Sequence, residues 1–200
     1  MKKLNNNGQY KKAIDLYEQE IKKENKQKTS LAVNQALKAS IELGDIKRGK
    51  DIHQNLSSTM INNSFIQSSL IRLYMKSGDY EQSKHIFMNS NNKTTLMFNN
   101  ILKGLIDNNR YEEALNFFKQ INITKDEYTY SILFKICTEI ANQHSLEFGQ
   151  LALNNMPKKF SNNIVVISSA LQMFIKCGDM IKAEQLFNQI EKKKPLLIVL

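Results

Sequence analysis

The stretch YMKSGDYEQSKHIF, residues 74–87, has a close echo in FIKCGDMIKAEQLF, residues 174–187. In both copies an aromatic residue is followed by a Lys, a Gly-Asp pair and a final Phe in the same register. A single compact domain gives no reason for such a repetition at a distance of 100 residues, whereas a stack of similar structural units does. The two copies therefore predict a repeat protein.

The Gly-Asp pair predicts the turn between two helices. Gly easily adopts the left-handed conformation that ends a helix, and Asp is a preferred cap for the helix that follows. Similar turns are predicted at Gly8 and at Gly44-Asp45, and Asn109 takes the place of Gly in another. A sixth turn, in TEIANQHSLEFGQLAL, is expected to contain a few inserted residues around His144.

Apolar residues recur at helical spacing on both sides of these turns. SFIQSSLIRLYMK and NIVVISSALQMFIK precede a turn, and EEALNFFKQI follows one. A small residue near the middle of the second helix would let the two helices of a pair approach closely. These small residues are Ala13, Ser83, Ala114 and Ala183.

The pattern predicts an all-α protein, a right-handed solenoid of stacked helix pairs without a linker. The expected units are residues 30–63, 64–94, 95–126, 127–163 and 164–194. A partial unit at 1–29 is expected to supply only a second helix, and 195–200 looks like the start of a truncated unit. Such open ends lack a polar capping unit, so self-association of an otherwise monomeric chain is expected there.

The composition argues against a disordered or membrane-embedded chain, with 42% apolar and 24% charged residues. The apolar runs in NIVVIS and PLLIVL are far shorter than the roughly 20 residues that span a bilayer. Lys and Arg number 28 against 19 Asp and Glu, which gives a net charge of +9. This excess favours a polyanionic partner without separating RNA from DNA or anionic lipid.

The sequence contains no recognisable catalytic or metal-binding motif. His53, His85 and His144 fall in different units without Cys or acidic residues at metal-ligand spacing. Gly-rich phosphate loops, a nucleophile elbow and the zinc deaminase signature are missing. Cys137 and Cys177 are expected to be reduced, small core residues. We therefore expect no enzymatic activity, no cofactor and no metal, and the first ten residues contain no clear targeting peptide.

Residues 96–133, LMFNNILKGLIDNNRYEEALNFFKQINITKDEYTYSIL, resemble the pentatricopeptide repeat (PPR). Its typical unit begins VTYN-LI-G, continues G--EEAL-LF--M and ends near PD, for which this chain has TKDE. LGDIKRGKDIH resembles the long variant of the repeat, and SSLIRLYMKSGDYEQSKHIF and ALQMFIKCGDMIKAEQLF resemble the short one. The order long, short, ordinary, long, short is similar to the mixed-length (PLS-type) subclass of organellar RNA-processing and editing factors, of which this chain looks like a fragment. The tetratricopeptide pattern is absent, and the chain has no Trp.

The resemblance implies that the first helices line a concave face and that each unit addresses about one RNA base. The base-reading residues would be a polar residue in the first turn of the first helix and the last residue of the unit. The implied pairs are Asn34 with Asn63, Ser68 with Thr94, Asn99 with Asp126, Ser131 with Asn163, and Ser168 with Lys194. The pair Asn99 and Asp126 implies a pyrimidine, most of all uracil; Asn34 with Asn63 also suits a pyrimidine, and the other pairs match poorly.

The resemblance implies two further sets of contacts. An apolar residue near the start of each first helix would sandwich the bases; these residues are Leu31, Phe65, Leu96, Tyr128 and Val165. Lys76 and Lys176, late in their first helices, would meet phosphates. Plainer interpretations remain: Asn34 and Asn99 as ordinary polar residues at a helix start, Leu31, Phe65 and Val165 as packing between units, and the two lysines as solvated surface.

The expected function is therefore target recognition on single-stranded RNA, in RNA processing or editing in the mitochondrion or another organelle. A separate enzyme, or a domain beyond this chain, would supply the chemistry, and no membrane is involved. The alternative is a scaffold whose inner groove binds a peptide, and a third reading is a degenerate repeat protein without a ligand. Lysines on the concave face would favour RNA, whereas an apolar groove with acidic rims would favour a peptide.

Overall fold

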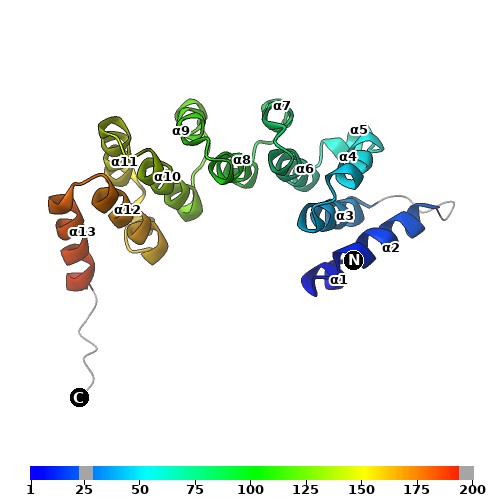
Figure 1. Ribbon diagram of the computed structural model, residues 1–200, viewed down its shortest axis with the longest axis horizontal. Coiled ribbons are helices and arrows are strands. Elements are labelled where there is room, and N and C mark those ends of the chain that lie inside the picture. The colour runs from blue at the N-terminus through cyan, green and yellow to red at the C-terminus, as the bar shows by residue number, and fades with distance from the viewer. Residues whose placement is uncertain (23–28, 194–200) are drawn as a thin grey trace, which may run out of the picture. The chain divides into compact units, whose positions relative to one another are not determined.

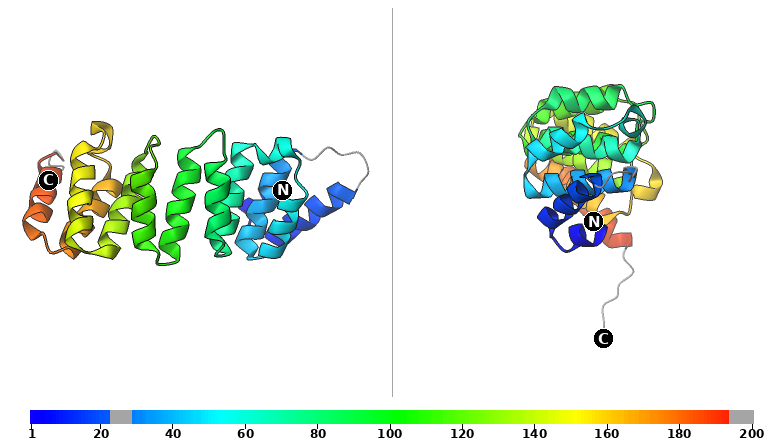
Figure 2. Two further views of the ribbon diagram at one scale, coloured as in Figure 1. Left: turned by 90° about the horizontal axis from the view of Figure 1, so that it is seen from above. Right: turned by 90° about the vertical axis from the view of Figure 1, so that its right-hand side faces the viewer.

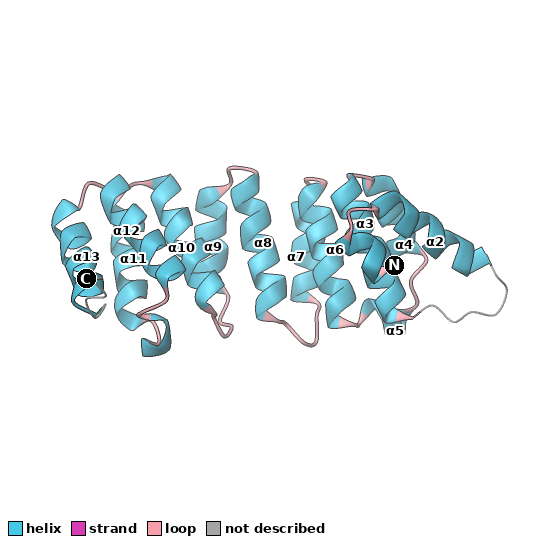
Figure 3. Cartoon of the chain, turned by 90° about the horizontal axis from the view of Figure 1, so that it is seen from below, coloured by secondary structure: helices cyan, strands magenta, loops and turns pink. Residues whose placement is uncertain are grey.

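The computed structural model describes residues 1–22 and 29–193, and in these residues it contains helices and loops but no strand (Figure 3). Side chains are described for 1–20 and 29–189. The helices are α1 (Lys2–Asn6), α2 (Tyr10–Lys22), α3 (Ser30–Leu43), α4 (Ile46–Gln54), α5 (Ser58–Ile61), α6 (Ser64–Lys76), α7 (Tyr80–Met88), α8 (Thr95–Asp107), α9 (Tyr111–Gln120), α10 (Glu127–Ile140), α11 (Gln143–Asn155), the short 3-10 helix η1 (Lys158–Phe160), α12 (Ile164–Lys176) and α13 (Met180–Lys193). The all-α helical-repeat class predicted from the sequence is confirmed. No helix in the described residues is both long enough and apolar enough to cross a membrane.

The turns between paired helices have the predicted chemistry. Gly8, Gly44, Gly78 and Gly178 have φ between 70° and 81°, and Asn109 has a φ of 58°, so all five are left-handed. The carboxylate of Asp79 then accepts a hydrogen bond from a backbone N–H in the first turn of α7, as an N-cap does. The glycine stops one helix and the aspartate starts the next, as the sequence predicted.

Two compact units divide the chain, Met1–Gly104 and Leu105–Leu200, and the division falls inside α8. In the first unit, α3, α6 and the greater part of α8 form one layer, and α4 and α7 form the other (Figure 1). The rings of Phe87 and Phe98, 6.3 Å apart, join α7 to α8, and the Asn100 side chain donates to the Ser68 carbonyl of α6 at 3.1 Å. In the second unit, α10 packs against α9, α11 and α12, and α13 packs against α12 (Figure 2).

The small residues predicted near the middle of the second helices are buried. Ala13, Ser83 and Ala114 are 0% exposed, and Ala183 is 4% exposed. The Ser83 hydroxyl of α7 also donates to the Ile71 carbonyl of α6 at 2.7 Å. At Ser83, a larger side chain would force α7 away from α6.

Two details of the expected organisation are wrong. The 1–29 segment contains not only a second helix, α2, but also the short helix α1 before it. The turn between α10 and α11 has no insertion, because only two residues, Ala141 and Asn142, separate these helices. The additional residues of 127–163 lie instead in the longer α11 and in η1, much as α5 lies near the end of 30–63.

The five first helices, α3, α6, α8, α10 and α12, begin at residues 30, 64, 95, 127 and 164, the first residues of the units proposed from the sequence. Residues 195–200 lie outside the described part of the chain. Cys137 and Cys177 are both free thiols, and Cys137 is completely buried. Burial raises the pKa of Cys137 to about 12, so this thiol stays protonated as a small core residue.

Candidate nucleic-acid interface

One narrow face of the first helices is open to solvent. In α6, Phe65, Arg72 and Lys76 are exposed and the remaining residues are buried or partly buried. These three residues are the second, ninth and thirteenth of the helix, and spacings of seven and eleven return to the same side of an α-helix. We call this face the open stripe.

The same three positions are exposed in the other two first helices of the first unit. They are Leu31, Lys38 and Glu42 in α3, and Leu96, Lys103 and Asp107 in α8, whose last residues belong to the second unit. In the second unit, α10 and α12 expose these positions too, together with a few of their neighbours. The open stripe is therefore a property of the repeat.

The predicted base-stacking residues all lie at the second position of the open stripe, and we call them the apolar row. Their exposed fractions are 63% for Leu31, 65% for Phe65, 53% for Leu96, 48% for Tyr128 and 60% for Val165. The plainer interpretation of Leu31, Phe65 and Val165 as packing between units would favour buried side chains, whereas these three are 60–65% exposed. Single exposed apolar residues are ordinary on a protein surface, but Leu31, Phe65 and Leu96 recur at one helix position within the first unit, which indicates a binding surface there. Stacking on bases remains a prediction for these residues.

The predicted base readers in the first turns are mostly buried beside the apolar row. Asn34, Ser68, Asn99 and Ser131 are 4–8% exposed, whereas Ser168 is exposed. The hydroxyls of Ser68 and Ser131 donate to backbone carbonyls one turn earlier, at 2.9 and 3.0 Å. A hydroxyl has a single proton to donate, so these two serines could only accept a hydrogen bond from a base.

Asn34 differs from the serines because its amide contacts the next repeat. Its Oδ1 atom accepts a hydrogen bond from the Ser69 hydroxyl of α6 at 2.5 Å. The acceptor is thus engaged across the repeat interface, and the amide N–H groups are the part of Asn34 suited to a base. The plainer interpretation of Asn34 as a polar residue at a helix start does not account for this contact.

The predicted readers at the ends of the units are caps of the following first helix. Asn63 accepts from the Phe65 and Ile66 N–H groups at 3.0 and 3.3 Å, and Asn163 makes the equivalent pair of bonds to α12. Asp126 forms a capping box with Thr129, whose N–H lies 2.8 Å from the carboxylate. Thr94 accepts from the first turn of α8. Lys194 lies outside the described residues.

Two lysines predicted to meet phosphates, Lys76 and Lys176, are exposed at the thirteenth position of α6 and α12. A second set of basic residues, which was not predicted from the sequence, lies on the open stripe at its ninth position. We call this set the basic row: Lys38, Arg72, Lys103 and Lys135. A search seven residues after each member of the apolar row would have found all four.

The open stripe is more basic in the first unit than in the second. In the first unit its ninth and thirteenth positions hold four basic side chains, of Lys38, Arg72, Lys76 and Lys103, against one carboxylate, of Glu42. Those of the second unit hold two basic and two acidic side chains. Glu42 forms an ion pair with Arg72, which joins α3 to α6 on this face. A polyanion would therefore be attracted mainly to the first unit.

The three histidines lie in unrelated surroundings. The Nδ1 atom of His53 is 2.7 Å from the Tyr74 hydroxyl, and burial lowers the pKa of His53, which favours the neutral ring. His144 is 2.7 Å from the Lys119 ammonium, and His85 is exposed on α7. Among the described side chains, no group of three or more His, Cys, Asp or Glu residues could hold a metal ion.

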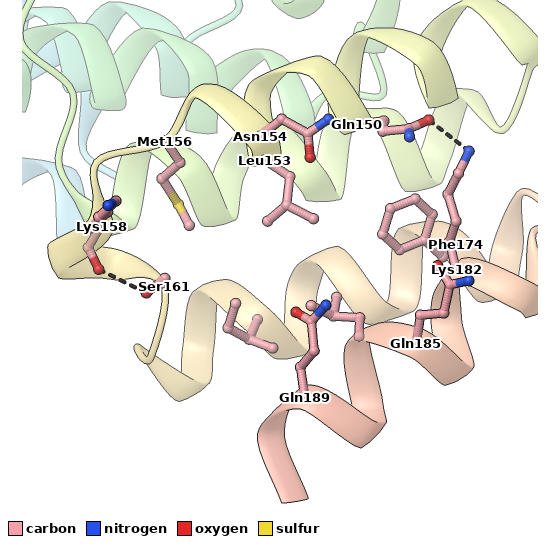
Figure 4. A pocket seen from close by; sticks show the side chains of 12 residues that line it. Gln150, Leu153, Asn154, Met156, Lys158, Ser161, Phe174, Lys182, Gln185 and Gln189 are labelled. Carbon is pink, nitrogen blue, oxygen red and sulfur yellow. Dashed lines mark hydrogen bonds between the residues drawn. The ribbon is translucent and has the colours of Figure 1, made fainter. Parts of the chain in front are cut away.

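A pocket of about 350 Å³ lies in the second unit between α11, α12 and α13 (Figure 4). Amide side chains such as Gln150, Asn154 and Gln185 line it together with apolar ones such as Leu153 and Phe174. The Lys182 ammonium donates to the Gln150 side chain at 2.7 Å and closes one end. None of the residues predicted to contact RNA lines this pocket.

Comparison with known proteins agrees with the repeat geometry. The family model "PPR repeat" matches residues 96–122 and 165–194. The chain contains PPR repeats. A mitochondrial pentatricopeptide repeat-containing protein of Arabidopsis thaliana is 28% identical over 80% of this chain, and a chloroplastic one from the same plant is 30% identical over 78%. The chain spans 23% of the length of each of these relatives.

Proposed function

We propose that this chain binds single-stranded RNA with sequence selectivity and serves as the target-recognition part of an organellar RNA-processing or editing system. The main support is the apolar row, in which five side chains at equivalent helix positions are 48–65% exposed. The mitochondrial and chloroplastic names of the PPR relatives support an organelle as the location. A separate enzyme or a further domain supplies the chemistry, and the chain itself acts as a binding module.

The chemistry of the open stripe suits unpaired nucleotides. Apolar side chains accept any base on its face, and each stacked base contributes about 1–3 kcal/mol. Short amide, hydroxyl and carboxylate groups, such as those of Asn99 and Asp126, suit the edge of a base. Five units address too few bases to define a transcript alone.

The alternative, a scaffold for a peptide, predicts an apolar groove with acidic rims. In the first unit the apolar row is instead accompanied by four basic side chains and one carboxylate. A basic border next to exposed apolar side chains favours a ligand that has both stacking faces and negative charge. Single-stranded RNA has both, and a peptide of ordinary composition does not.

The proposal is tested by selecting RNA from a randomised single-stranded pool with the purified chain and sequencing the bound fraction. We expect enrichment of uracil at one position, which is lost in the Asn99→Ser and Asp126→Ser variants. Serine at position 126 keeps an N-cap for α10, because Ser and Asp cap helices about equally well. The matched control is Asp79→Ser, which makes the same change at the cap of a second helix, α7.

The possible results separate two claims. If the pool returns unselected, the chain does not recognise RNA and the proposed function is wrong. If a sequence is enriched but does not change in the Asn99→Ser and Asp126→Ser variants, RNA binding stands and the assignment of these residues as readers is wrong. A similar change with Asp79→Ser would attribute the effect to helix stability.

A further inference from the structure

We propose that the basic row of the first unit, Lys38, Arg72 and Lys103, binds the phosphodiester backbone of single-stranded RNA. This inference rests on the proposed function and adds to it the part of the surface that holds the strand. The lysines predicted from the sequence, Lys76 and Lys176, lie one turn further along their helices. The sugar-phosphate backbone of the RNA then lies beside the ninth residue of each first helix and not beside the thirteenth.

The basic row is regular along the chain. Lys and Arg make up 28 of the 200 residues, yet they occupy the ninth position in four of the five first helices. The fifth helix, α12, has Gln172 there. The thirteenth position has no such regularity, because it holds Glu42, Asp107 and Glu139 as well as two lysines. The charge is thus positive at the ninth position of four helices, whereas its sign varies at the thirteenth. A ligand that contacts the ninth position explains this difference.

The spacing between the apolar row and the basic row suits a nucleotide. The ninth residue lies two turns after the second on the same side of the helix, about 10 Å along its axis. α3 packs against α6, and α6 against α8 (Figure 1), and neighbouring helices that pack in one layer are about 8–10 Å apart. The apolar row and the basic row therefore run parallel across these three helices. A nucleotide whose base lies on the apolar row can extend its sugar and phosphate toward the basic row.

Arg72, in the middle of the basic row, forms an ion pair across two helices. Its guanidinium pairs with Glu42 on α3, and both side chains are partly exposed, at 47% and 35%. An exposed pair of this kind contributes little stability, so an RNA phosphate can compete with Glu42 for the guanidinium. Arg binds phosphate through two parallel N–H groups, which suits it to a fixed point in the middle of the row.

The test is the salt dependence of binding between the whole chain and an oligouridylate, measured by fluorescence anisotropy. Each phosphate contact with single-stranded RNA steepens the plot of log affinity against log salt by about 0.7, so three contacts contribute about 2. We expect the triple variant K38Q/R72Q/K103Q to have a slope that is shallower by about 2. The conservative variant K38R/R72K/K103R should keep the original slope.

The matched control is K11Q/K12Q/K47Q, which removes three charges from exposed lysines of α2 and α4. An equal loss of slope in this control would mean that only the net charge matters, and would overturn the proposal. An unchanged slope in K38Q/R72Q/K103Q would also overturn it while leaving RNA binding intact. Should the unaltered chain not bind the oligouridylate, the sequence enriched from the randomised pool replaces it as the probe. Failure to bind that RNA as well would remove both the proposed function and this inference.

Two further measurements test for binding to another polyanion and for loss of folding. Binding to phosphatidylserine vesicles is measured in parallel, and a row that is needed for vesicles but not for RNA would overturn the proposal. Circular dichroism checks the helical content of each variant. Should the triple variant lose helix, the single variants replace it, each with an expected loss of slope of about 0.7.

Discussion

At the scale of the residue, the side chains predicted to recognise RNA also hold the fold together. Asn63, Asp126 and Asn163 each cap a first helix, and the Ser68 hydroxyl is bonded to its own helix. This double use restricts which bases the repeats could read, because part of the hydrogen-bonding capacity of each side chain is already engaged. It also means that loss of binding in a variant is informative only when the cap is preserved.

Gly104→Ala is expected to destabilise the protein, although Ala usually favours a helix over Gly by about 1 kcal/mol. A Cβ atom at position 104 would lie 2.6 Å from both Cβ and Cε of Met75, where α8 approaches α6. The Met75 Cβ is fixed to its backbone and cannot rotate away, so the helices would have to separate at a cost of about 1–3 kcal/mol. The midpoint of urea denaturation should therefore fall.

Gly49→Ala is the matched comparison for Gly104→Ala. The nearest atoms to a Cβ at position 49 are the Leu73 methyl carbons, at 2.5 and 2.9 Å, which are the far end of a side chain. Rotation of Leu73 can relieve part of this contact, so the loss of stability should be smaller than for Gly104→Ala. A gain of stability in Gly104→Ala would show that α8 and α6 do not pack as closely as described.

Only some of the residues on the open stripe could be predicted from the sequence. It predicted the apolar row by resemblance to the PPR, and all five of its members are exposed. It missed the basic row because a lysine in a helix has no local pattern that separates a binding residue from a solvated one. The periodic exposure of the second, ninth and thirteenth positions became visible only when burial was known.

At the scale of the element, the sequence predicted best where turn chemistry and apolar spacing agree. Left-handed Gly78 followed by the cap Asp79 lies between α6 and α7, as expected. The short helices α5 and η1 were missed because four and three residues are too few to show a helical period. The turn after α10 was misjudged as an insertion because its left-handed residue is Ala141 rather than Gly or Asn.

Ala141→Gly is expected to stabilise the second unit by about 1 kcal/mol, because a left-handed conformation is strained for any residue with a Cβ atom. Ala141 has a φ of 51° and is exposed, so the change removes strain without opening a cavity. Thermal unfolding followed by circular dichroism should show a higher midpoint. The control, Ala152→Gly inside α11, should lower the midpoint by a similar free energy, since Gly is unfavourable within a helix. A lower midpoint for Ala141→Gly would mean that the turn does not need a left-handed residue.

At the scale of the whole molecule, the division at Gly104 could not be predicted from the sequence. The repeats continue through α8 without a Pro-rich or Gly-rich linker, and the unit boundaries proposed from the repeats do not coincide with position 104. Repeat proteins are stabilised by each unit and its nearest neighbours, so distant parts of the chain need not unfold together. The two compact units are the natural candidates for separate unfolding.

Separate unfolding of the two units can be measured through Cys137, because the reactivity of this thiol depends on the second unit alone. It is 0% exposed and its pKa is raised to about 12, so at pH 8 it has almost no thiolate and reacts with iodoacetamide only when the second unit opens. Phe134→Ala and Phe98→Ala form a matched pair, since both rings are 0% exposed, one in each unit. Each truncation should cost about 3–5 kcal/mol.

We expect Phe134→Ala to accelerate alkylation of Cys137 by at least about a hundredfold, because a loss of about 3 kcal/mol increases the open population by that factor. Phe98→Ala should accelerate it much less, although both variants lose a similar part of their total stability. Peptide mass spectrometry separates Cys137 from Cys177, which is only partly buried and therefore reports less on unfolding. Equal acceleration by the two variants would show that the chain unfolds as one cooperative structure. The first unit, with its basic row, would then depend for its folding on the second, and a single destabilising change in either unit would abolish RNA binding.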